Sequence, residues 1–299
     1  MLIQTTDEMR QLTGNYYANN DFEKVMGEID LATDELAKIV GQAVIERAER
    51  REIEDAELLT KVQRPIALLA ALRMYQKNDL SHEDDGRKVK MSTDDSEKIP
   101  WEWQLDRDDA LQLESYYRAT DALIRFLESK SIPEWTESPN YKERQALIIR
   151  SGEDFDRYFP IEKSERTYLL LLPAIREAQR MTVSGAYGPK WQELLADTTI
   201  PESDVHYAAC MAVALLALSI TLRRTPLSLI PGGVVRGYLS RNGMTNTQPA
   251  SLQDVDKVAS WMSEDAADWV AKMQRARDGG EANYTLMPSN DPRNKYCRL

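Results

Sequence analysis

Apolar residues recur at helical spacing along most of the chain. In the first clear stretch, Phe22, Val25, Met26 and Ile29 occupy positions i, i+3, i+4 and i+7, which is the pattern of one helix face. Asp21 can cap this helix, because its side chain can accept a hydrogen bond from a free N–H group of the first turn. The polar residues before it predict a loop or docking arm over residues 1–20.

Further helices are predicted to follow. Thr33 can cap the second helix, and a third is expected to run from Pro65 to Asn78. Pro65 fits the first turn of that helix, where a missing N–H group has no bond to lose. Apolar residues return at helical spacing between 106 and 130. The sequence therefore predicts a first helical unit over residues 21–130.

Residues 86–103 interrupt the helical pattern. The segment Lys88-Val89-Lys90-Met91 alternates between charged and apolar residues, with the period of a strand. Pro100 disfavours helical backbone at the residue before it. We therefore expect a protruding hairpin over about residues 86–103, which ends with Trp101 and Trp103.

The second half of the chain shows a similar order. A linker is predicted over residues 131–152, and Ser164 can cap the helix that follows it. Residues 205–222 are almost continuously apolar, so this helix is expected to be the most buried. An extended excursion is predicted over about residues 227–240, and a closing helix follows.

Two sequence matches suggest that one unit occurs twice. The triplet Glu57-Leu58-Leu59 and Pro65 both have counterparts 136 residues later, in Glu193-Leu194-Leu195 and Pro201. Chance similarity between two amphipathic helical stretches is the alternative. The sequence predicts a mainly α fold of two tandem helical-bundle units, each with a short β-hairpin or extended excursion. The expected bounds are 21–130 and 153–278, with a flexible C-terminal arm at 279–299.

Composition narrows the class of protein. A chain of 299 residues fits one large or two medium domains. The net charge of -11 argues against a protein that holds duplex nucleic acid by neutralising its phosphates. The longest apolar run, residues 208–218, is shorter than the roughly 20 residues that span a bilayer. The segment Met1 to Arg10 has no apolar core of a signal peptide. We therefore expect a soluble protein that does not contact a membrane.

Two patterns raise the possibility of metal binding. His206 and Cys210 are spaced i, i+4 and could supply two ligands, but no second pair accompanies them, so a hydrogen-bonded histidine in a packed core is the favoured alternative. Adjacent acidic residues could bind a hard cation, although the spacing of a calcium loop is absent and turn or helix-cap roles explain them. These pairs are Asp84-Asp85, Asp94-Asp95 and Asp108-Asp109. We expect no metal, no cofactor and no catalytic residue.

The predicted excursions carry the candidate binding residues. Basic side chains beside exposed tryptophans could contact nucleic acid through charge and stacking. A protein partner is the favoured alternative, because interfaces concentrate tryptophan and arginine. The candidate partner-binding residues are Arg87, Lys88, Lys90, Trp101, Trp103, Arg236 and Tyr238.

The chain also resembles a known group of proteins. The segments Gly86 to Lys90, Lys98 to Asp108 and Tyr116 to Ala119 are similar to an uncharacterised family encoded in phages and prophages of Bacteroidetes. That family looks like tailed-phage head-to-tail connector (adaptor) proteins, which are small helical bundles assembled as a ring below the portal. Such adaptors are typically one helical unit long, whereas two units are expected here. The resemblance supplies no catalytic motif.

The resemblance implies a structural role in a virion. The expected partners are further copies of the chain in a ring, the portal protein, and tail or stopper proteins, and DNA would pass through without sequence-specific binding. The expected location is the neck of the virion, after synthesis in the host bacterial cytoplasm. The alternative is a cytoplasmic helical protein–protein interaction or scaffolding module, and a third hypothesis is an enzyme that uses clustered carboxylates.

Overall fold

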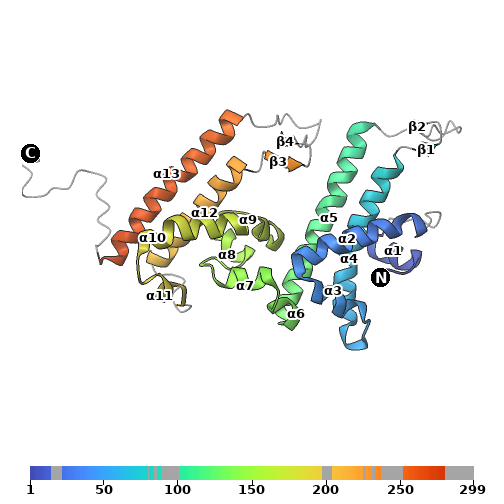
Figure 1. Cartoon of the computed structure of the whole chain (residues 1–299), viewed down its shortest axis with the longest axis horizontal. Coiled ribbons are helices and arrows are strands. Elements are labelled where there is room, and N and C mark those ends of the chain that lie inside the picture. The colour runs from blue at the N-terminus through green and yellow to red at the C-terminus, as the bar shows by residue number, and fades with distance from the viewer. Residues whose placement is uncertain are drawn as a thin grey trace, which may run out of the picture.

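The protein is built from two helical halves that lie side by side along its longest axis (Figure 1). The computed structural model describes residues 1–14, 22–79, 81–83, 86–88, 101–196, 204–224, 227–230, 233–236 and 252–279. Within these residues nearly all regular structure is helical, so the predicted mainly α fold is confirmed.

The first half contains five helices among the described residues, a 3₁₀ turn and one pair of short antiparallel strands. In chain order these are α1 (Thr6–Thr13), α2 (Phe22–Val40), α3 (Gln42–Glu49), the turn Ile53–Asp55, α4 (Ala56–Asn78), β1 (Ser81–Glu83), β2 (Gly86–Lys88) and α5 (Glu102–Ser129). In the strand pair, His82 lies opposite Arg87.

Three short helices connect the halves: α6 (Pro133–Thr136), α7 (Pro139–Gln145) and α8 (Gly152–Asp156). The second half then continues with α9 (Glu165–Ala178), a π turn (Gln179–Val183), α10 (Ser184–Tyr187), α11 (Trp191–Ala196), α12 (Asp204–Arg224), β3 (Leu227–Ile230), β4 (Gly233–Arg236) and α13 (Leu252–Arg277). In this strand pair, Ser228 lies opposite Val235.

Each half has its own hydrophobic core. The first core gathers buried side chains from α1 to α6, including Ile29, Ile66 and Trp135. The second core begins after α7 and includes Phe155 and Tyr168. Leu169 packs against both cores, and it is only partly buried. The two cores are therefore separate hydrophobic clusters, joined through a narrow zone around α5, α7 and α9.

The order of elements repeats between the halves, with α10 as an extra element. A helix (α2 or α9) is followed by a short helix (α3 or α11), a long helix (α4 or α12), a strand pair and a second long helix (α5 or α13). The first long helix packs against equivalent neighbours in both halves: α4 contacts α2 and α5, and α12 contacts α9 and α13.

The long helices of the repeat are offset by more than the 136 residues that separate the two Glu-Leu-Leu triplets. Helix α4 ends at Asn78 and α12 ends at Arg224, which is 146 residues later. The two Glu-Leu-Leu triplets do not correspond, because the first lies in α4 and the second in the short helix α11. The matched tetrapeptide is instead Ala67-Leu68-Leu69-Ala70 in α4, which recurs as Ala214-Leu215-Leu216-Ala217 in α12.

Several local expectations are corrected in the first half. Thr33 does not cap a helix, because α2 continues through it and the Thr33 hydroxyl donates to the Ile29 carbonyl. Helix α4 begins at Ala56, so Pro65 lies inside the helix. The segment 1–20 is not simply an arm, because residues 6–13 form α1 and Leu2, Ile3 and Met9 are buried in the first core.

The predicted linker also carries more structure than expected. Trp135 in α6 is fully buried in the first core, and Arg144 in α7 is 4% exposed. Packing of these two residues ties the segment to both halves. Within residues 279–299, the predicted C-terminal arm, 280–299 lie outside the described residues.

Helix α12 is, among the described helices, long and apolar enough to cross a membrane by length and composition. Its buried face packs against α9 and α13 and forms the centre of the second core. The core helix of a soluble protein passes the same test, so one such helix is weak evidence for a membrane span.

Candidate partner-binding surfaces

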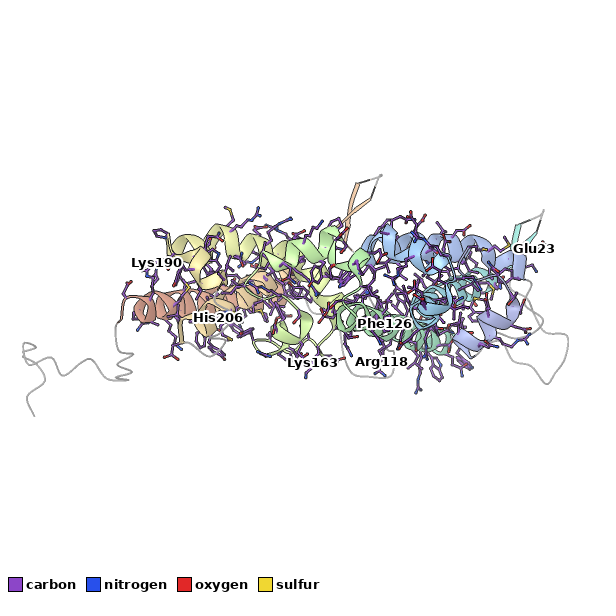
Figure 2. The ribbon with its side chains drawn as sticks, turned by 90° about the horizontal axis from the view of Figure 1, so that it is seen from below. Glu23, Arg118, Phe126, Lys163, Lys190 and His206 are labelled. Carbon is purple, nitrogen blue, oxygen red and sulfur yellow. The ribbon has the colours of Figure 1, made fainter. Side chains whose placement is uncertain are left out.

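Both strand pairs lie on the same side of the molecule, one on each half (Figure 1). In Figure 1 the pair β1–β2 follows α4, and β3–β4 follows α12, at the upper end of each half. Figure 2, turned by 90°, shows the cyan and orange strand pairs projecting to the same side. The repeat therefore presents two similar projections in one direction.

The predicted hairpin bounds differ from the observed strands. The first pair spans residues 81–88, so strand pairing starts five residues before Gly86, where the hairpin was expected to begin. At the far end, Trp103 lies in α5, which begins at Glu102, rather than in an extended segment. The second pair, 227–236, falls within the predicted excursion 227–240.

The candidate binding residues fall on both halves. Arg87 and Lys88 lie on β2, and Arg236 lies on β4. Lys90 and Tyr238 lie outside the described residues. The predicted set is thus divided between the two projections and does not form a single cluster in the described part of the chain.

Trp101 and Trp103 are exposed aromatic residues at the start of α5. Their side chains are 71% and 41% exposed. The backbone N–H of Trp101 donates to Oε1 of Gln104 at 2.9 Å, which fixes the start of α5. Because the helix start is held by this bond, both indoles are presented from a defined backbone, as a binding anchor requires.

A buried ion cluster joins the two halves. The Arg144 guanidinium lies 2.5 Å from Glu128 of α5 and 3.5 Å from Glu165 of α9. It also stacks against the rings of Trp135 and Tyr141, at 5.5 and 4.8 Å from their centroids. One arginine therefore pairs with carboxylates from both halves, and no pattern in the sequence predicts this cluster.

The environment of Glu165 changes its acidity. Burial, and secondly the nearby Glu128 carboxylate, raise the pKa of Glu165 to about 7, although hydrogen bonding from the Gly152 N–H and the charge of Arg144 oppose this. Two carboxylates share one cation, so one negative charge in the cluster remains uncompensated. Burial, and after it this like charge, therefore raises the pKa of Glu165 and lets the carboxylate take up a proton near neutral pH.

Asp121 forms a second link between the halves. Its Oδ1 accepts hydrogen bonds from the Ser164 hydroxyl at 3.2 Å and from the Arg166 backbone N–H at 2.7 Å. Ser164 in turn caps α9 by accepting from the Thr167 N–H at 3.1 Å, which confirms its predicted role. The start of α9 is therefore held by a side chain of α5.

An open groove of about 480 Å³ lies beside this link, between α2, α4, α5, α7 and α9. Its apolar lining includes Leu113 and Leu169. Arg166 stacks on the ring of Tyr117 at 3.7 Å, and Arg73 pairs with Glu35 at 2.5 Å. The groove thus combines apolar surface with three cationic side chains, the third being Lys38.

Of the sequence-predicted pair His206 and Cys210, Cys210 lies in the second core and His206 is only partly buried. Nδ1 of His206 and Sγ of Cys210 are 3.6 Å apart, and Cys210 is fully buried. Burial raises the pKa of the Cys210 thiol to about 12, so the reactive thiolate is suppressed. No group of three or more metal-binding side chains occurs among the described residues.

The acidic pairs are partly described. In α5, Asp108 accepts a hydrogen bond from Gln112 at 2.6 Å and Asp109 accepts one from Gln76 at 2.9 Å. These contacts give the pair a structural role. The pairs Asp84-Asp85 and Asp94-Asp95, and Cys297, lie outside the described residues.

The fold and these surfaces define a two-part helical protein with projecting strand pairs. The chain belongs to the family of unknown function DUF6712, whose profile matches residues 20–145 and 193–295. No curated protein and no solved structure matches the chain.

Proposed function

We propose that the protein is a structural head-to-tail connector of a tailed bacteriophage, which forms a ring between portal and tail. The observation that carries this proposal is the pair of projections. One strand pair extends from each of two similar helical halves, and both extend toward the same side of the molecule. A ring subunit needs such projections to reach a neighbouring layer, and it needs other surfaces for contact with copies of itself.

The exposed tryptophans fit the contact with the portal protein. Trp101 and Trp103 supply large exposed apolar area at the start of α5, and such residues dominate the energy of protein interfaces. Tail or stopper proteins would bind the face of the ring that points away from the portal. The net charge of -11 suits passage of DNA, because an acidic surface repels phosphates.

The test is a binding measurement with purified portal protein from the same phage. The double variant Trp101→Ala with Trp103→Ala is expected to weaken portal binding by at least about tenfold, because two interface anchors are lost. The matched control is Leu111→Ala, which removes a side chain that is 54% exposed on the same helix. Negative-stain electron microscopy of the complex should show rings.

Two outcomes count against the proposal. If the wild-type chain binds no portal protein and forms no rings with it, the connector function is wrong. If the tryptophan variant no longer binds a single protein partner other than portal, but virions still assemble with it, the protein is an interaction or scaffolding module of the bacterial cytoplasm.

A further inference from the structure

The groove between the halves carries positive charge in an acidic protein. Of its cationic side chains, Arg73 is paired with Glu35, whereas Arg166 and Lys38 form no ion pair with any described residue. Leu170 at its rim is 63% exposed. This combination fits a partner that presents an apolar side chain flanked by acidic groups.

Helix α13 presents that combination on its outer face. Trp261 is 53% exposed and Val258, one helical turn before it, is 38% exposed. Glu264 and Asp265 follow Trp261 by three and four residues, so they lie on the same face. Both carboxylates are exposed and form no ion pair within the described part of the chain. We call Val258, Trp261, Glu264 and Asp265 the α13 ridge.

We propose that the α13 ridge of one copy docks into the groove of a second copy, with Trp261 against the leucines and the acidic pair near Arg166 and Lys38. Charge complementarity favours this occupant. The two carboxylates of the ridge outnumber the one ammonium group beside it, Lys257, whose Nζ lies 4.9 Å from the centroid of the Trp261 ring, and they match Arg166 and Lys38 in the groove. The groove volume of about 480 Å³ has room for an indole ring.

The contact is heterologous, since it joins two different surfaces. Each copy offers one groove and one ridge, and repetition of such a contact generates a closed ring or an open filament. This inference rests on the self-association that is part of the proposed function, and it names the two surfaces responsible.

The test uses two full-length variants that each damage one surface. Leu170→Glu places a carboxylate at the groove rim, and Trp261→Glu removes the centre of the ridge. By sedimentation velocity, each variant alone is expected to self-associate at least about tenfold more weakly than the wild type. An equimolar mixture should form a one-to-one dimer, because Leu170→Glu retains its ridge and Trp261→Glu retains its groove.

Two controls make the result specific. Ile53→Glu introduces the same charge at a side chain that is 95% exposed and does not line the groove, and it should associate like the wild type. The charge exchange Lys38→Glu with Asp265→Lys should restore association that Lys38→Glu alone weakens. Circular dichroism of each variant should match the wild-type spectrum, because all five substituted sites are exposed or lie at a groove rim.

The inference is overturned if the mixture stays monomeric, if both single variants assemble normally, or if the wild type is monomeric at all concentrations. Portal binding is measured separately through Trp101 and Trp103. If the chain binds the portal protein but does not form the contact between ridge and groove, only the present inference is refuted. If it forms this contact but does not bind the portal protein, only the connector function is refuted.

Discussion

The guanidinium group of Arg144 lies 3.5 Å from the carboxylate of Glu165, and both residues are buried between the two halves. Glu128 approaches the same guanidinium at 2.5 Å, so the cluster holds two acids and one base. Its charge therefore depends on the protonation of Glu165, and the stability of the protein should depend on pH for this reason.

The first prediction concerns Glu165→Gln. The pKa of Glu165 is about 7 in the folded protein and near its ordinary value of 4.5 after unfolding, so the folded state binds more protons in between. Its contribution to stability is therefore present below pH 4.5 and is lost as the pH rises through about 7. Between about pH 5 and about pH 8, the free energy of unfolding of the wild type should fall relative to the variant by about 2 to 3 kcal/mol.

Urea denaturation at the two pH values measures this difference. The matched control is Glu153→Gln, whose exposed carboxylate pairs with Lys163 at the surface. That variant should follow the wild-type pH dependence. Parallel pH dependence of the wild type and Glu165→Gln would show that Glu165 is ionised like an ordinary glutamate.

The second prediction concerns Arg144→Met. Loss of the guanidinium leaves the Glu128 and Glu165 carboxylates near each other without a counter-charge, which should lower the free energy of unfolding by about 3 to 5 kcal/mol. Adding Glu128→Gln and Glu165→Gln to this variant should recover most of the loss, because the unpaired charges are then removed. Thermal unfolding of the single and triple variants measures the recovery, and an equally unstable triple variant would indicate that stacking on Trp135 and Tyr141 matters more than charge.

Local patterns predicted much of the fold. The helix expected over 106–130 is observed as α5, and the buried helix expected over 205–222 is observed as α12. The Ser164 cap was also correct. These features depend on neighbouring residues, because helical periodicity and capping act within one or two turns.

The register of the repeat and the ion cluster could not be predicted in the same way. The two Glu-Leu-Leu triplets are identical by sequence but lie in α4 and α11, whose tertiary neighbours differ. Arg144 sits in a polar helix, and its burial arises only when acids from α5 and α9 meet beside Trp135. Such contacts join residues far apart in the chain, so no local pattern records them. The expected hairpin start failed for a related reason, since Ser81–Glu83 is entirely polar and carries no alternation.

The third prediction concerns Gly152→Ala at the start of α8. A Cβ atom at Gly152 would lie 2.6 Å from the Ser164 carbonyl oxygen and 3.0 Å from the Glu165 backbone nitrogen. Because backbone atoms must move to relieve this contact, the variant should be destabilised by about 1 to 3 kcal/mol.

Gly185→Ala is the control for this variant. A Cβ atom at Gly185 meets no atom within 4 Å, and the residue lies in helix α10, where alanine is favoured over glycine. This control should be neutral or slightly stabilising in the same urea titration. Equal effects of the two substitutions would mean that the packing of α8 against the start of α9 is loose.

The last prediction tests whether the chain before α2 is part of the first core. Ile3 is fully buried, and the Leu2 carbonyl next to it accepts hydrogen bonds from Arg51 at 2.6 Å and from Gln63 at 2.8 Å. Ile3→Ala should therefore leave a cavity and lower the free energy of unfolding by about 2 to 5 kcal/mol. Ile53→Ala makes the same chemical change at a side chain that is 95% exposed and should alter stability by less than about 0.5 kcal/mol. If both variants unfold at the wild-type urea midpoint, residues 1–14 are a detached arm in solution. If only Ile3→Ala lowers the free energy of unfolding, these residues are part of the core that supports α4 and the first projection.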